Sequence, residues 1–478
     1  MSKTFSYMGA TSFFCLAFCL STSPVFAAPA WPQFRGPNGA GVAEKDKPPA
    51  VFGPTTNMLF QVSVPPGASS PSIWGNRLFL TALEGGKLET ICLDRRDGKV
   101  LWKKLAPAEK LEAFHPTEGS PAASTPATDG NRVYVYFGSC GLLAYDLNGK
   151  ELWHVPMPPA THVGDFGTGT SPIIYRGAVV LNRDMLAGSS IMAVNAKTGK
   201  LLWKQERPQA LSSYSTPVIW QHDGKAEVVV ASSQRMQAYD LKTGQGSWQV
   251  QGLPNATCTT PVLGDGLLFF AGWSPGAKET RMPSFSDLVE KADRNKDGAL
   301  QKPEIADNQM LALLFTLFDM NGDGKIVQEE WDTRSKTMSQ GDNALMAVDM
   351  KAGAPKVLWK QTRGLPYVPS PLFYKGLLYI VKDGGMASCF DAKTGKPHYE
   401  QERIGSTGTY YSSPVAADGR IYIVSATGKV TIFSAGEKAE VLGKADLGER
   451  CITTPAIAEN ALYFRTSGHL WAFGKEKK

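Results

Sequence analysis

A Ser-Pro or Thr-Pro pair opens a short strand-like run eight times along this chain of 478 residues. The prolines of these pairs are Pro71, Pro126, Pro172, Pro217, Pro261, Pro371, Pro414 and Pro455. Outside one large gap, the pairs recur every 41–55 residues. A repeat of about 40–50 residues with four strand-like pieces is typical of a β-propeller blade. The repeat therefore predicts an all-β chain that closes into a ring.

Most units also carry a strand that ends at Asp or Asn, a turn with Gly, and then an aromatic residue. Clear copies run from Ala144 to Trp153, Ala193 to Trp203, Ala238 to Trp248 and Cys389 to Tyr399. The Asp or Asn side chain can bond the turn backbone, and the glycine supplies a positive φ. We interpret the aromatic residues as packing between blades, because large rings bury much apolar area. The turn glycines are Gly149, Gly199, Gly244 and Gly395, and the tryptophans are Trp102, Trp153, Trp203, Trp248 and Trp359.

The number of blades follows from the two ends of the repeat. The last unit, Cys451–Phe473, has only three strand-like pieces, and the segment Asn57–Val64 precedes the first pair as an isolated strand. Joining these pieces completes one blade and removes the free sheet edges. The sequence thus predicts an eight-bladed β-propeller.

The repeats resemble the PQQ-like propeller family, which includes quinoprotein dehydrogenases and BamB-like envelope assembly factors. The resemblance covers residues 59–474 except for one insertion. It implies either a periplasmic PQQ-dependent oxidoreductase or an assembly factor. Quinoprotein dehydrogenases hold PQQ on the propeller axis beneath a disulfide between adjacent cysteines, beside a catalytic Asp and a calcium ion. This chain has no adjacent cysteines, so we expect no PQQ and assign no catalytic residue.

The insertion carries the strongest chemical signal. Between Pro261 and Pro371 the repeat lengthens, and the extra residues fall between the second and third strands of the fifth unit. Two stretches there, Asp293–Glu304 and Asp319–Glu330, match the twelve-residue EF-hand calcium loop. Calcium prefers hard oxygen ligands, which positions 1, 3, 5, 7 and 12 of such a loop supply. The expected ligands are Asp293, Asn295, Asp297, Ala299, Glu304, Asp319, Asn321, Asp323, Lys325 and Glu330, with Ala299 and Lys325 acting through their backbone carbonyls.

Other positions of the insertion support an EF-hand pair. Gly298 and Gly324 stand where each loop must turn sharply, and the apolar Leu300 and Ile326 suit a short strand pairing between the loops. Ser284 begins a capping box for an entering helix, and the apolar run Met310–Phe318 can pack the pair together. We expect two calcium sites, with affinities of about 10⁻⁴ to 10⁻³ M sufficing outside the cell.

The N-terminus predicts export. Lys3 precedes the apolar stretch Met8–Leu20, and Val25–Ala27 offers small residues at a cleavage site. We expect a signal peptide and a periplasmic or extracellular location, with no transmembrane segment, because the apolar stretch is short. The expected organisation is a signal peptide at 1–27, an N-terminal arm at 28–56, propeller at 57–272 and 343–474, an EF-hand pair at 273–342 and a basic tail at 475–478.

Composition narrows the function further. The chain is 42% hydrophobic and 20% charged with a net charge of +6, and no basic run suggests nucleic acid. The five cysteines outside the signal peptide are far apart, so neither a metal knuckle nor a disulfide scaffold is expected.

Loops before the inner strands and between the second and third strands share one face, which we call the propeller mouth. They bring polar residues there: His115, His162, Asp165, Arg183, Asp184, Tyr214, Arg235, Tyr367, Lys382, Asp383, Tyr410 and Arg465.

We therefore expect a monomeric, calcium-binding, PQQ-like propeller that acts as a binding or scaffolding protein. Its partner would be an unidentified protein or small ligand at the propeller mouth. The quinoprotein oxidoreductase and the BamB-like assembly factor stay open as alternatives.

Overall fold

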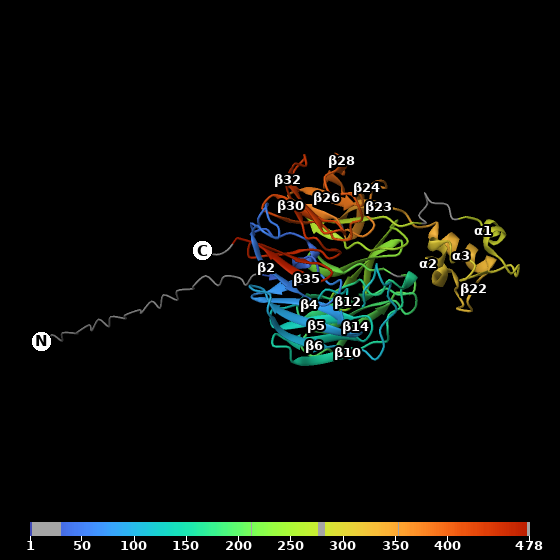
Figure 1. The fold of residues 1–478 in the computed structure, drawn as a ribbon, viewed down its shortest axis with the longest axis horizontal. Helices are drawn as coiled ribbons and strands as arrows, with labels where there is room; N and C mark the ends of the chain where they lie inside the picture. Colours follow the sequence, from blue (N-terminus) through green and yellow to red (C-terminus); the bar gives the residue numbers. More distant parts are fainter. Residues whose placement is uncertain (2–29, 212, 276–282, 352, 476–478) are drawn as a thin grey trace.

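The computed structural model is a ring of eight antiparallel β-sheets with a helical lobe beside it (Figure 1). It describes residue 1 and residues 30–211, 213–275, 283–351 and 353–475. The predicted signal peptide after Met1 and nearly all of the basic tail lie outside these residues. The eight-bladed propeller predicted from the repeat is confirmed.

Each blade has four strands, ordered from the axis outward, and in blade 1 the short strand β1 (Ala30–Trp31) adds a fifth by pairing with β3. Blades 1 to 4 consist of β3 (Ser72–Trp74), β4 (Arg77–Glu84), β5 (Lys87–Asp94) and β6 (Val100–Leu105); β7 (Ala127–Thr128), β8 (Arg132–Phe137), β9 (Gly141–Asp146) and β10 (Glu151–Pro156); β11 (Ile173–Tyr175), β12 (Ala178–Arg183), β13 (Ser190–Asn195) and β14 (Leu201–Glu206); and β15 (Val218–His222), β16 (Lys225–Ser232), β17 (Arg235–Asp240) and β18 (Gly246–Gln251).

The second half of the ring repeats this order, with two departures. Blades 5 to 8 consist of β19 (Val262–Gly264), β20 (Leu267–Gly272), β23 (Ala344–Lys351) and β24 (Ala354–Gln361); β25 (Leu372–Tyr374), β26 (Leu377–Lys382), β27 (Met386–Asp391) and β28 (Pro397–Arg403); β29 (Val415–Ala417), β30 (Arg420–Val424), β31 (Lys429–Ser434) and β32 (Val441–Asp446); and β33 (Ala456–Ala458), β34 (Ala461–Arg465), β35 (His469–Phe473) and β2 (Met58–Ser63). The chain leaves blade 5 after β20 for the insertion, and blade 8 joins both ends of the chain.

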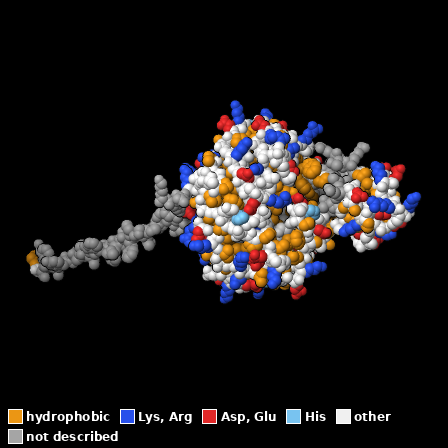
Figure 2. Space-filling model, viewed as in Figure 1, with side chains coloured by type: hydrophobic (Ala, Val, Ile, Leu, Met, Phe, Trp, Pro, Cys, Tyr) orange, Lys and Arg blue, Asp and Glu red, His pale blue; other side chains and the backbone are white. Residues whose placement is uncertain are grey.

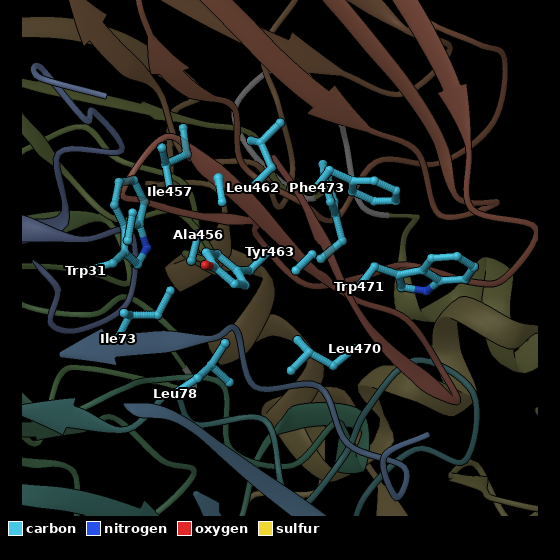
Figure 3. Packing of buried hydrophobic residues seen from close by; sticks show 14 of the residues in the cluster. Trp31, Ile73, Leu78, Ala456, Ile457, Leu462, Tyr463, Leu470, Trp471 and Phe473 are labelled. Carbon is cyan, nitrogen blue, oxygen red and sulfur yellow. The ribbon is translucent and has the colours of Figure 1, made fainter. Parts of the chain in front are cut away.

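The ring closes where β2 pairs with β35, from Met58 opposite Phe473 to Ser63 opposite His469. This pairing confirms that the segment before the first repeat completes the last blade. A buried cluster spans the junction between blades 8 and 1, and Figure 3 shows Trp31 beside Ile73 and Ile457 within it. The closure therefore rests on a sheet ladder and on a continuous apolar core.

Tryptophans from the outer strands join neighbouring blades, as predicted. The indole nitrogens of Trp102, Trp153, Trp203 and Trp359 donate to backbone oxygens in the turn of the next blade, at 2.8–3.1 Å. Each ring covers the turn glycine of that blade, where a Cβ would lie only 2.4–2.8 Å from the indole. The four glycines have φ between 70° and 84°. Glycine is therefore required there for both backbone conformation and space.

Trp248 departs from this pattern. Its indole nitrogen donates to Glu227 of its own blade at 2.7 Å, and its ring meets Trp220 edge-on. The turn of the following blade, around Gly353, leaves open space where a Cβ would stand. Trp248 nevertheless packs against a buried cluster formed by blades 4 and 5, so the predicted packing between blades holds for it, whereas its indole nitrogen bonds within its own blade.

The insertion forms a compact lobe of three helices and a two-stranded sheet. Its elements are α1 (Phe285–Ala292), β21 (Leu300–Gln301), α2 (Gln309–Phe318), β22 (Lys325–Ile326) and α3 (Gln328–Met338). Ser284 caps α1 by accepting from the Asp287 amide at 3.2 Å. Trp331 is buried and stacks on Phe318 at 4.3 Å. The lobe has its own apolar core, and Figure 2 shows its separate surface studded with charged side chains.

Candidate functional site

The Ser-Pro and Thr-Pro pairs form a closed ring of hydrogen bonds around the propeller axis. In each blade the hydroxyl oxygen of the Ser or Thr accepts from the backbone amide of its counterpart in the preceding blade. The eight bonds measure 2.9–3.2 Å and involve Ser70, Thr125, Ser171, Thr216, Thr260, Ser370, Ser413 and Thr454. We call these eight residues the hydroxyl ring.

Both residues of each pair have a physical role in this ring. The hydroxyl satisfies a buried amide of the neighbouring blade, and all eight side-chain positions are buried. The proline restricts the preceding residue to extended backbone, which fixes the direction of its hydroxyl. Within the described residues, none of the eight hydroxyls donates to another protein group.

A cavity of about 440 Å³ lies on the axis at the propeller mouth. We call it the axial cavity. Its aromatic lining consists of Phe34, Phe166, Tyr214, Tyr367, Tyr410 and Tyr411. Six members of the hydroxyl ring line it: Ser70, Thr125, Ser171, Ser370, Ser413 and Thr454. Its charged lining residues are Glu118 and Asp383, and none of the described lining residues is Lys or Arg. Such a largely apolar cavity with a few polar groups is typical of a small-ligand site.

The N-terminal arm crosses the propeller axis and contributes Phe34 to this cavity. Its backbone meets blade 2 through the Thr128 amide, which donates to Pro32 at 2.8 Å. Arg35 donates to the Pro371 carbonyl in blade 6 at 2.6 Å, and Asn38 exchanges two hydrogen bonds with Ile219 in blade 4, both at 2.8 Å. Because these blades lie on different sides of the ring, the arm spans the ring and places Phe34 in the cavity lining.

A buried polar cluster lies behind one wall of the cavity. Thr168 lines the cavity and donates to Glu112 at 2.7 Å, and His162 lies 3.5 Å from the same hydroxyl. Burial raises the pKa of Glu112 to about 7, and burial together with the nearby Arg183 lowers the pKa of His162 to about 4. At neutral pH His162 is therefore uncharged, and Glu112 keeps its proton to a higher pH than an exposed carboxyl does. The His162 ring packs on Tyr214 at 5.3 Å, so the cluster supports the cavity wall.

The structure brings four of the predicted mouth residues together in the axial cavity. These are Tyr214, Tyr367, Asp383 and Tyr410. Two other predicted groups serve the fold instead: Asp184 forms a buried ion pair with Arg207 at 2.8 Å, and Arg465 donates to the backbone of blade 1. The remaining six, His115, His162, Asp165, Arg183, Arg235 and Lys382, are not among the residues lining the cavity.

Sequence reasoning missed several lining groups. Glu118 accepts from the Tyr411 hydroxyl, and Arg450 lies 3.7 Å from the same carboxylate and over the Tyr411 ring. Phe34 was also missed, because nothing in the sequence places the arm on the axis. The hydroxyl ring was visible as the Ser-Pro and Thr-Pro repeat, but its hydrogen-bonding role needs the neighbouring blade to be in place.

The second EF-hand loop, Asp319–Glu330, is held together by hydrogen bonds to its last glutamate. Glu330 accepts from the amides of Met320, Asn321 and Val327 at 2.8–3.2 Å, so its carboxylate joins the start and the end of the loop. Gly324 takes a φ of 85° at the sharp turn. One oxygen of Asp319, Oδ1, is buried without a hydrogen-bond partner. An unpartnered carboxylate oxygen inside such a loop fits a bound cation.

The first loop, Asp293–Glu304, has the same backbone geometry. Glu304 accepts from the Arg294, Asn295 and Gln301 amides at 2.9–3.3 Å. Leu300 pairs with Ile326 in the short β21–β22 ladder, which confirms the predicted pairing between the loops. Here Lys325 of the second loop donates to Asp297 at 2.9 Å, and this hydrogen bond lowers the pKa of the Asp297 carboxyl.

No cluster of three or more His, Cys, Asp or Glu side chains poised around a metal position exists in the described parts of the chain. Each loop has an asparagine at its third position, and the carboxylates of Glu304 and Glu330 accept hydrogen bonds from loop amides. The ligand assignment for calcium therefore stays a prediction. The donor set itself, carboxylate, amide and carbonyl oxygens, fits calcium.

The EF-hand lobe touches the propeller beside the axial cavity. Val163, Leu186 and Leu211 from the propeller loops pack against the apolar core of the lobe. Helix α2 contacts the short 3-10 helix η2 (Val163–Asp165), and the next residues of the chain, Phe166–Gly169, line the cavity. The Gln234 side chain also donates to the Thr337 carbonyl of α3 at 2.5 Å. The lobe thus contacts propeller loops that adjoin the cavity wall.

A family model described as "Outer membrane protein assembly factor BamB", of PQQ-like type, matches residues 50–271 and 334–435 of this chain. These ranges cover more than half of the chain. The chain belongs to this PQQ-like propeller family. A separate EF-hand model matches residues 311–333, which include all of the second loop, most of α2 and the first half of α3.

Solved structures agree on the fold. BamB from Moraxella catarrhalis is similar with a TM-score of 0.55 and 13% identity, covering 87% of this chain and 99% of its own. A europium-containing methanol dehydrogenase gives 0.61 and 10%, covering 94% and 98%. A quinohemoprotein alcohol dehydrogenase from Comamonas testosteroni gives 0.58 and 11%, covering 94% and 81%. No curated protein matches this chain. At these identities the similarity extends to the fold alone.

PQQ, the cofactor that the family name implies, can be compared with this cavity by charge. PQQ carries three carboxylates, whereas the described lining offers two acids and no Lys or Arg. All five cysteines of the described chain are free thiols. The residues present therefore do not fit PQQ, and we derive no step through it.

Among the described residues, the structure also has no helix long and apolar enough to cross a membrane.

Proposed function

We propose that this chain is an exported, calcium-dependent binding protein, in which the EF-hand lobe binds two calcium ions and the axial cavity binds a partner or ligand. The observation that carries the proposal is the pair of complete twelve-residue loops, each folded around its last glutamate. The buried, unpartnered oxygen of Asp319 supports a cation in the second loop.

The contact between α2 of the lobe and η2, which adjoins the cavity wall, supports the proposal that binding at the cavity depends on calcium. Ions in both loops would stiffen the lobe, because each ion ties together loop oxygens that otherwise bond only to loop amides. Helix α2 leads directly into the second loop and packs on η2, whose chain continues into the cavity wall at Phe166–Gly169. Calcium would therefore stabilise the wall in one arrangement and raise affinity at the cavity.

Titration calorimetry with calcium tests the metal part. The wild-type chain is expected to bind two ions, and the Glu304→Gln, Glu330→Gln double variant to bind none. A matched control is Glu290→Gln with Glu329→Gln, since both of these glutamates are exposed helix residues outside the ligand positions. Two bound ions in the first double variant, or none in the wild type, would overturn the assignment.

A pull-down from envelope extract, with calcium or with EDTA, tests the binding part. The proposal expects capture that depends on calcium and is lost in a Tyr410→Ala variant of the cavity. Calcium-independent capture of outer-membrane β-barrel proteins would instead favour the assembly-factor alternative, which the family match supports. An absorbance titration with PQQ and calcium, followed by dye reduction with alcohols and sugars, tests the oxidoreductase alternative.

N-terminal sequencing of the mature protein tests export. The signal-peptide prediction expects cleavage after Ala27 and recovery from the periplasm or medium. Light scattering of the purified mature chain tests the expected monomer.

A further inference from the structure

The two calcium loops differ in what occupies their carboxylates. In the first loop, Asp297 Oδ2 accepts from Lys325 Nζ at 2.9 Å and from Gln301 Nε2 at 2.9 Å. In the second loop the equivalent carboxylate, Asp323, receives no lysine or arginine from the described residues, and Asp319 Oδ1 has no partner there. The first loop thus already holds a positive charge at a predicted ligand, and the second does not.

The position of Lys325 follows from the β21–β22 ladder. Lys325 stands opposite Gln301 in that ladder, so its side chain starts beside the first loop although its backbone belongs to the second. Its carbonyl oxygen is the seventh-position group expected to face the second ion. One residue therefore offers an oxygen to one site and an ammonium group to the other.

We propose that Lys325 is an internal competitor for calcium at the first loop, so that the second loop fills first and the first loop fills only at higher calcium. This inference rests on the proposed calcium binding. Calcium at the first loop needs Asp297 as a ligand, so the ammonium group must leave before the ion binds. The ammonium group of Lys325 would also stay close enough to repel the ion after it has moved.

The expected size of the effect is modest because the pair is partly exposed. The side chains of Lys325 and Asp297 are 46% and 31% exposed, and water screens such an ion pair, so its loss should change calcium affinity by a factor of only about 1.5 to 5. Residual repulsion between the ammonium group and a divalent ion, screened by salt, brings the total to about three- to tenfold in calcium affinity.

The test uses the full mature chain with one loop inactivated at a time. The Glu330→Gln background reports the first loop, and the Glu304→Gln background reports the second. We expect Lys325→Gln to tighten calcium binding at the first loop by about three- to tenfold and to change the second loop by less. The charge-matched control is Lys336→Gln on α3, which removes a lysine outside both loops.

Two glycine amides supply a readout specific to each loop. Gly298 donates to Asp293 at 2.9 Å and Gly324 donates to Asp319 at 3.0 Å, so their NMR signals respond to their own loop. In the wild type the Gly324 signal should shift at lower calcium than the Gly298 signal, and Lys325→Gln should narrow this gap. An unchanged gap, or equal effects of Lys325→Gln and Lys336→Gln, would overturn the inference while leaving calcium binding intact. Absence of any calcium response in the wild type would instead overturn the proposed function.

Discussion

Removing a single hydroxyl from the hydroxyl ring should destabilise the propeller measurably, although the change is nearly isosteric. Thr260 accepts from the Thr216 amide at 3.2 Å, and both residues are at most 2% exposed. In Thr260→Val the volume is kept, but the Thr216 amide is left buried without an acceptor. A buried unsatisfied donor costs about 1–3 kcal/mol.

Thr259 provides a control at the adjacent position. It is fully buried, and its hydroxyl has no hydrogen-bond partner among the described residues. Thr259→Val therefore removes an unsatisfied polar atom without orphaning another group, so the free energy of unfolding should stay constant or rise. For a chain of 478 residues the unfolding entropy is about 1 kcal/mol per kelvin, so Thr260→Val should lower the Tm by about 1–3 °C in scanning calorimetry.

The ring geometry also predicts how two such changes combine. Thr125→Val and Thr260→Val orphan amides in separate blades with no shared partner, so their costs should add. Thr216→Val and Thr260→Val both act on Thr216, because this residue donates one ring bond and accepts another. Their combined cost should differ from the sum. Equal Tm shifts for Thr260→Val and Thr259→Val would refute the role of the ring.

Three further outcomes follow from the structure. Burial raises the pKa of Glu112 to about 7 in the fold, whereas the unfolded carboxyl ionises near its ordinary pKa of 4.5. The contribution of Glu112 to stability therefore falls as pH rises from about 4.5 through 7. Glu112→Gln should flatten this part of the stability–pH curve, whereas Glu109→Gln should not. Removal of calcium with EDTA should increase hydrogen exchange in α2 and in 163–169 and leave the amide of Thr216 protected. A chain that begins at residue 66 loses β2 and the arm, and it should aggregate or lose its cooperative melt in calorimetry.

The sequence was sufficient for the parts of the fold that repeat. Asx turns at Asn195 and Asp240 form as the motif predicts, with their side chains accepting turn amides at 2.7–3.0 Å. These interactions are local, and the motif recurs in several blades, so each copy strengthens the prediction made from the others. The EF-hand pair could be predicted for the same reason, because each twelve-residue loop carries its whole pattern within one short stretch of sequence.

The axial cavity could be predicted only in part, since its lining is assembled from loops of many blades. The position of Tyr410 at the mouth follows from its place before an inner strand, and it lines the cavity as expected. Phe34 reaches the cavity through contacts of the arm with several blades, which leave no periodic trace in the sequence. Arg465, predicted at the mouth, is fully buried because it satisfies backbone oxygens of blade 1 at the ring closure.

The place of the insertion explains how blade 5 keeps its ladder although an EF-hand lobe interrupts it. Gly272 and Ala344, the last residue before the insertion and the first strand residue after it, are ladder partners in blade 5. The lobe thus replaces a hairpin turn, and because it folds around its own core, its length costs the blade little loop entropy. The returning chain is held by Lys360, which donates to Asp342 at 2.6 Å. The lobe meets the propeller through the packing of α2 on η2, through Leu186 and Leu211, and through the Gln234–Thr337 hydrogen bond, and the chain that follows η2 continues into the cavity wall.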